Sequence, residues 1–199
     1  MQPNIHRALA QVQALQQTVI DGQRFRGWSG PARGVSGAAA FIAAMIMAQP
    51  SYPATHLAHL LGWGAVFVIA MIANHGAMAY WFLFDPKVQR DWRKLTPVFE
   101  IAPSVVVGGV LTAACLRLGQ FDLLFGLWMA VFGLTNLAAR RVLPRSLVWV
   151  GIFYIAAGTI FLLTPGAGFL NPWPMGLVFF AGELAGGAIL HLDKTRRFA

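Results

Sequence analysis

Two ionisable residues lie inside long apolar stretches of this sequence, where a charge is costly unless it is paired or hydrated. Glu183 is near the middle of one stretch, and His75 is slightly to one side of the middle of another, at a similar depth. A histidine and a carboxylate at one depth could exchange a proton near neutral pH. We therefore predict that His75 and Glu183 form a buried pair that binds a proton or an ion or lines a path.

Four further polar residues are candidates for the same site. They are Asn74, Asn136, Tyr154 and Glu100. The alternative interpretation is a structural one, in which a neutral Glu183 makes a hydrogen bond inside the bundle. In both cases the small residues Gly182, Gly186 and Gly187 allow a close helix approach, so Glu183 is expected to face protein and not lipid.

Other chemistry is disfavoured by the residue types and their spacing. Cys115 is the single cysteine, so a thiolate metal cage is excluded. His56 and His59 lack a third ligand nearby, and His75 and His191 differ in predicted depth by roughly 12 Å, which disfavours a bis-histidine haem. The sequence also lacks the HExxH and GxxxxGK motifs. We predict no metal and no cofactor, and enzymatic activity is uncertain and disfavoured.

The elements that must position these residues are predicted from composition. Of 199 residues, 57% are hydrophobic and 11% are charged, against about 25% charged in typical soluble domains. The apolar runs are continuous and do not alternate with a period of two, so helices are preferred over a barrel. The fold class is all-α, a polytopic membrane bundle. Its six transmembrane helices are predicted near residues 34–50, 58–84, 97–116, 121–139, 146–164 and 173–191.

The basic residues predict the orientation. With six spans, 14 of the 15 Lys and Arg residues lie on one side, and Arg117 is the exception. The positive-inside rule then places both termini in the cytoplasm. Arg33, at the start of the weakly apolar first span, is expected to reach the headgroups by snorkelling. The net charge of +8 is therefore a topology signal, and we expect no nucleic-acid partner.

Three regions follow from this organisation. Residues 1–30 are a cytoplasmic segment with a narrow apolar stripe, which lies on the membrane surface or pairs with another copy as a short coiled coil. Residues 31–192 are the six-helix domain, and residues 193–199 are a short basic tail.

The stretch GLWMAVFGLTNLAARRVLPRSLVWVGIFYIAAG, from Gly126 to Gly158, resembles small uncharacterised polytopic proteins of the bacterial inner membrane. The resemblance implies a location and no activity. Basic residues near the inner ends of the spans suit anionic lipid headgroups. They are Arg140, Arg141, Arg145, Arg196 and Arg197.

Three classes of function remain open. The preferred one is a non-enzymatic scaffold, accessory subunit or sensor with a buried polar site around His75 and Glu183. The alternatives are a small transporter or channel that uses these two residues, and an enzyme that acts on a lipid-soluble substrate. A homo-oligomer or a partner in a membrane complex is also expected.

Overall fold

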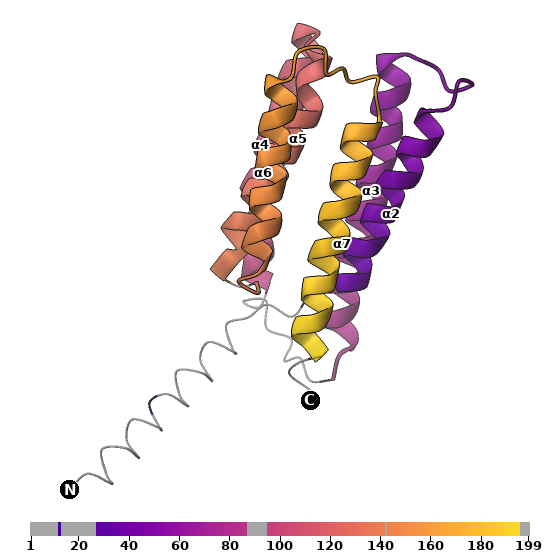
Figure 1. Ribbon diagram of the computed structural model, residues 1–199. Coiled ribbons are helices and arrows are strands. Elements are labelled where there is room, and N and C mark those ends of the chain that lie inside the picture. Colours follow the sequence, from indigo (N-terminus) through magenta and orange to yellow (C-terminus); the bar gives the residue numbers. More distant parts are fainter. Residues whose placement is uncertain (1–11, 13–26, 87–94, 142, 196–199) are drawn as a thin grey trace, which may run out of the picture.

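The computed structural model describes Val12 and residues 27–86, 95–141 and 143–195, and all regular elements in these ranges are helical. The predicted N-terminal amphipathic segment falls mostly outside the described residues, as do Arg196 and Arg197. The helices, shown in Figure 1, are α2 (Gly30–Met47), α3 (His56–Phe84), α4 (Thr96–Leu118), α5 (Leu124–Ala138), α6 (Leu147–Leu163) and α7 (Trp173–Thr195), with short 3-10 turns η2 (Phe121–Leu123) and η3 (Ala139–Arg141).

Five helical segments in the described ranges are long and apolar enough to cross a membrane. They are Gly30–Met47, His56–Phe84, Ile101–Leu118, Phe121–Ala138 and Trp173–Asp193. The remaining predicted span, 146–164, corresponds to α6, a shorter apolar helix of 17 residues. The prediction of an all-helical fold is therefore confirmed, and several of its helices are long and apolar enough to span a membrane.

Local sequence signals explain several helix ends. The Ser29 hydroxyl accepts the N–H of Ala32 at the start of α2, and Thr55 does the same for Ala58 at the start of α3. Gly119 follows α4 with a φ of 69°, a left-handed conformation that favours glycine and ends the helix. Helices α2 and α3 thus each begin where a side chain accepts a hydrogen bond from a free backbone N–H.

The helices form two groups of three, α2 with α3 and α7, and α4 with α5 and α6 (Figure 1). Within the first group α2 packs along α7, although the two helices are far apart in the sequence. A Cβ atom on Gly30 would lie 2.6 Å from the carbonyl oxygen of Gly187, so the two backbones touch at this point. Such small-residue contacts replace hydrophobic collapse as the basis of helix packing in a bilayer.

The second group contains an equally close pair, α5 and α6. A Cβ on Gly133 would lie 2.7 Å from the Gly151 carbonyl oxygen, and one on Gly158 would lie 2.7 Å from the Gly126 carbonyl oxygen. The glycines are seven residues apart on each helix, so two turns of antiparallel backbone are held in contact. The two groups meet mainly where α6 packs on α7, with smaller contacts between α5 and α7.

The expectation that Arg33 snorkels to the headgroups is wrong. Helix α2 begins at Gly30, so Arg33 lies in its first turn, and the residue is only 6% exposed. Its guanidinium packs over Gly186, where a Cβ would be 2.7 Å from the Arg33 Cζ. A glycine on α7 therefore provides the space for a buried arginine, and a carboxylate on the same helix provides its counter-charge.

Candidate functional site

A buried ion pair joins α2 to α7. The Nη2 of Arg33 donates to Oε1 of Glu183 at 2.6 Å, and Nε donates to Oε2 at 3.1 Å. Both residues are buried, with 6% and 3% of their surface exposed. This two-point contact between a guanidinium and a carboxylate is the geometry in which a charge pair is strongest and most directional.

Helices α5 and α6, of the other group, supply two further hydrogen-bond partners for the ion pair. Tyr154 on α6 donates its hydroxyl to Oε1 of Glu183 at 3.1 Å, and Nη1 of Arg33 donates to Oδ1 of Asn136 on α5 at 3.1 Å. Asn136 is itself held in place, because its Nδ2 donates to the Phe132 carbonyl at 2.8 Å. We call Arg33, Glu183, Asn136 and Tyr154 the central polar cluster. It connects α2, α5, α6 and α7.

The central polar cluster is closely packed. Tyr154 is completely buried, and a Cβ on Gly182 would overlap its ring. Gly37 on α2 faces Glu183, since a Cβ there would lie 3.0 Å from the Glu183 Cβ. Phe132 lies under the cluster, with its ring centroid 5.9 Å from the Arg33 Cζ and 4.9 Å from the Tyr154 ring. Removing either charge would leave the other in this apolar setting without a counter-ion.

A second polar contact lies beside this cluster, between α2 and α3. Ser36 on α2 is buried one turn from Arg33, and its hydroxyl donates to the Ala32 carbonyl at 3.0 Å. Asn74 on α3 donates from Nδ2 to Ser36 Oγ at 2.9 Å and to the Ala70 carbonyl at 2.9 Å. Polar side chains on α3, α2, α7, α6 and α5 thus form two adjacent hydrogen-bonded groups.

The structure brings together some of the predicted site residues and not others. Glu183, Asn136 and Tyr154 meet at Arg33, and Asn74 lies in the adjacent group. His75 is half-buried, and its Nδ1 lies 3.1 Å from the carbonyl of Met71 on its own helix. Within the described residues no hydrogen bond joins His75 to Glu183, because the carboxylate contacts Arg33 and Tyr154. The side chain of Glu100 lies outside the description.

The three predicted packing glycines all lie at contacts. Gly182 faces Tyr154, Gly186 faces Arg33 and Gly187 faces the backbone of Gly30. Arg33 is the site residue that sequence reasoning missed. Two signals pointed to it, namely the small residues on both sides of it in the first span and the unpaired Glu183 in the last.

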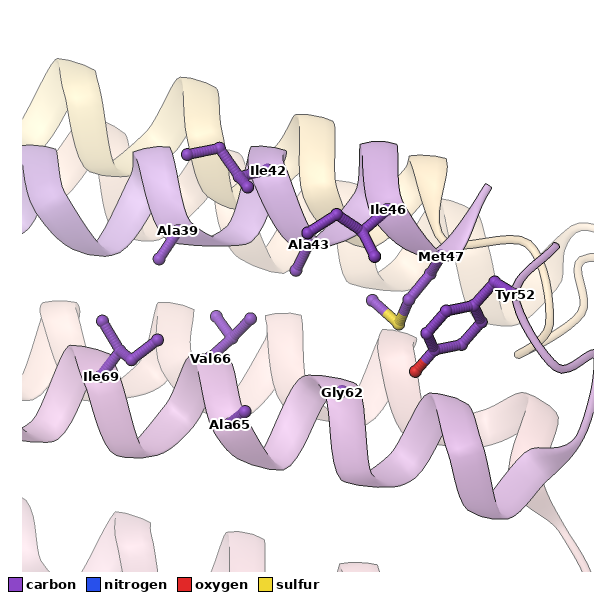
Figure 2. A pocket seen from close by; sticks show the side chains of 10 residues that line it. All are labelled: Ala39, Ile42, Ala43, Ile46, Met47, Tyr52, Gly62, Ala65, Val66 and Ile69. Atoms are coloured by element: carbon purple, nitrogen blue, oxygen red, sulfur yellow. The ribbon is translucent and has the colours of Figure 1, made fainter. Parts of the chain in front are cut away.

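An apolar groove lies between α2 and α3 (Figure 2). Its volume is about 380 Å³, and its walls include Ile42, Ile46, Val66 and Ile69. The hydroxyl of Tyr52 at one end donates to the Ala58 carbonyl at 2.7 Å. The labelled lining offers no other polar side chain, so the groove suits hydrocarbon and not a polar substrate.

Aromatic side chains gather at the end of the bundle away from Arg33. His56 stacks on Phe121 at a centroid distance of 4.3 Å. Phe169, in the loop between α6 and α7, is completely buried, and its N–H donates to Oδ1 of Asp122 at 2.8 Å. No group of three or more metal-ligating residues occurs among residues 27–86, 95–141 and 143–195. The single cysteine, Cys115, is buried.

At the opposite end, the turn between α5 and α6 presents basic side chains. Arg140 and Arg145 are both exposed, and Trp149 one turn into α6 is 72% exposed. Exposed arginine beside exposed tryptophan is the arrangement expected at a membrane interface.

Each member of the central polar cluster is thus hydrogen-bonded to another member, and the groove between α2 and α3 is apolar. No protein-family model, curated protein or solved structure matches this chain.

Proposed function

We propose that this chain is a six-span protein of a bacterial inner membrane that acts as a non-enzymatic scaffold or accessory subunit. The observation that carries the proposal is the bonding of the central polar cluster. Both carboxylate oxygens of Glu183 accept hydrogen bonds from Arg33 or Tyr154, and a further Arg33 nitrogen is bonded to Asn136. Such a closed arrangement is suited to fixing helices in place.

The closed arrangement argues against exchange at Glu183. An ion or proton site must gain and lose a ligand, so at least one group must be open to water in some state. Glu183 is instead covered by Gly37 on one helix and Tyr154 on another. A buried ion pair of this kind favours one register of α2 against α7, which is the best-attested use of such pairs.

The proposed orientation has both termini in the cytoplasm. Because Arg33 is buried in the bundle, 13 of the 15 basic residues remain for the predicted cytoplasmic side. This bias still satisfies the positive-inside rule. Anionic lipid headgroups are the proposed partners of that side, together with a second copy of the chain or another membrane protein.

A second candidate function, the movement of a proton or small ion, is supported by the Asn74–Ser36 contact. It extends hydrogen-bonding groups from α3 to within one turn of Arg33, and Asn74 precedes His75 in the sequence. In this reading His75 exchanges the proton, and the ion pair opens during transport.

The experiment uses the purified protein in liposomes that enclose a pH-sensitive dye, together with crosslinking in native membranes. The scaffold proposal predicts no proton flux above that of empty liposomes, and a crosslinked complex of defined size. Transport predicts a flux that His75→Ala abolishes while the matched variant His56→Ala, at the far end of the same helix, retains it. Such a flux would overturn the scaffold proposal, and strictly monomeric protein in membranes would also contradict it.

A further inference from the structure

Two buried nitrogen atoms at the aromatic end of α3 have no hydrogen-bond partner among the described protein atoms. They are Nε2 of His59, a residue that is 2% exposed, and Nε1 of Trp63, a residue that is 4% exposed. Buried polar groups are nearly always bonded, and each unsatisfied one disfavours the folded state by about tenfold or more. Two such atoms within one helical turn therefore require an explanation.

The hydrogen-bonding roles of the two atoms are complementary. His59 Nδ1 lies 3.2 Å from the Thr55 carbonyl oxygen, which can only accept, so Nδ1 bears the proton in the neutral ring. Nε2 is then an acceptor. The indole Nε1–H of Trp63 is a donor and cannot accept. A group that satisfies both must donate one hydrogen bond and accept another, and a hydroxyl group does this, whereas a carboxylate or an ammonium group does not.

The placement of the two side chains allows one group to reach both. Residues four apart lie on the same face of a helix, with Cβ atoms about 5–6 Å apart. One oxygen that makes two hydrogen bonds of about 2.8–3.0 Å can join two nitrogen atoms up to about 6 Å apart, a reach that side chains on one helix face can meet. Both rings also face one aromatic cluster, because His59 lies 6.4 Å from Phe169, Trp63 lies 5.5 Å from Phe125, and those two phenylalanine rings are 4.8 Å apart.

We propose that His59 and Trp63 hold one hydroxyl-bearing molecule between them, either water or the hydroxyl end of a small alcohol. The site lies within the first two turns of α3, close to the exposed residues Thr55 and His56, so a molecule from the aqueous phase has a short way to travel. It is independent of the central polar cluster and of the proposed scaffold function.

A double-mutant cycle of His59→Phe and Trp63→Phe tests the proposal, because the cycle cancels the packing that each substitution loses. A shared hydroxyl predicts that the two substitutions are coupled by about tenfold in the unfolding equilibrium constant, measured in mixed detergent micelles. The control cycle pairs Trp63→Phe with His56→Phe, at an exposed histidine one turn away, and is expected to be additive. Coupling below about twofold between His59 and Trp63 would overturn the proposal.

A second measurement uses the unmodified protein, labelled with ¹⁵N-tryptophan in lipid nanodiscs. A cross-peak between the Trp63 indole proton and water identifies water as the occupant. A saturable shift of the same resonance on titration with 1-butanol identifies an alcohol site. If neither is seen, the indole N–H is directed at the ring of Phe125, to which Trp63 lies edge-on at 81°, and the proposal fails.

Discussion

Replacing Glu183 by glutamine removes the counter-ion of a buried arginine while preserving the shape of the side chain. Arg33 donates two hydrogen bonds to the carboxylate, at 2.6 and 3.1 Å, and only 6% of the residue is exposed. Breaking such a pair from one side costs about 3–5 kcal/mol, because the remaining charge stays buried. Glutamine keeps one accepting oxygen for Arg33, so we expect Glu183→Gln to lower the free energy of unfolding by about 3 kcal/mol, at the low end of that range.

Two further variants separate charge from hydrogen bonding. Tyr154→Phe removes one hydrogen bond to the carboxylate and leaves both charges, so a loss of about 1.5–3 kcal/mol is expected. Replacing both charged residues, as Arg33→Met with Glu183→Leu, removes the buried charges together. Apolar replacement of a whole pair is often neutral, and the hydrogen bonds lost by Tyr154 and Asn136 cost about 1 kcal/mol each. The double variant should therefore be within about 2 kcal/mol of the wild type.

The assay is reversible unfolding in mixed micelles with increasing denaturing detergent, followed by tryptophan fluorescence and far-ultraviolet circular dichroism. The reasoning is refuted if Glu183→Gln stays within about 1 kcal/mol of the wild type, which would mean that the guanidinium is already hydrated. It is also refuted if the double variant loses the sum of the losses that Arg33→Met and Glu183→Leu cause singly, since the charges would then contribute independently.

Two other predictions concern packing and topology. Gly133→Ala should destabilise the protein by about 1–3 kcal/mol, because its Cβ would meet the backbone of α6. Gly109→Ala, where the added Cβ faces open space inside α4, should be neutral or stabilising by up to about 1 kcal/mol, and thermal unfolding of both variants measures the difference. The orientation is tested in a Cys115→Ala background with a membrane-impermeant maleimide added to intact spheroplasts. The reagent should label Ser51→Cys, in the α2–α3 loop, and should not label Ser146→Cys, in the α5–α6 turn. The reverse labelling pattern would invert the proposed orientation.

The extent of the helices could be predicted from the sequence because long apolar runs have few structural alternatives in a membrane. The last predicted span, 173–191, begins at the first residue of α7 (Trp173–Thr195), and the third, 97–116, falls within α4 (Thr96–Leu118). Predicted span 121–139 covers the 3-10 turn η2, helix α5 and the first residue of the 3-10 turn η3. Such small deviations depend on local turn geometry and not on hydropathy.

The partner of Glu183 could not be predicted, because hydropathy gives the depth of a residue and not the direction in which its helix faces. Depth alone pairs His75 with Glu183, but α3 is only weakly amphipathic, so no apolar stripe fixes its rotation. The sequence places Arg33 in the headgroup region because it lies at the edge of a weakly apolar span. Its inward direction depends on the close contact of α2 with α7, between residues about 150 positions apart in the sequence.

That separation has a consequence for how the protein is made. Arg33 enters the membrane with the first described span, whereas Glu183 is translated 150 residues later with the last one. Until then the arginine has no carboxylate to pair with, and from the first turn of a lone helix its side chain can reach the membrane–water interface. The buried position of Arg33 is therefore reached only when α7 arrives with its counter-charge. Synthesis of the chain proceeds from one end to the other, but assembly of this bundle is completed by its first and last described helices together.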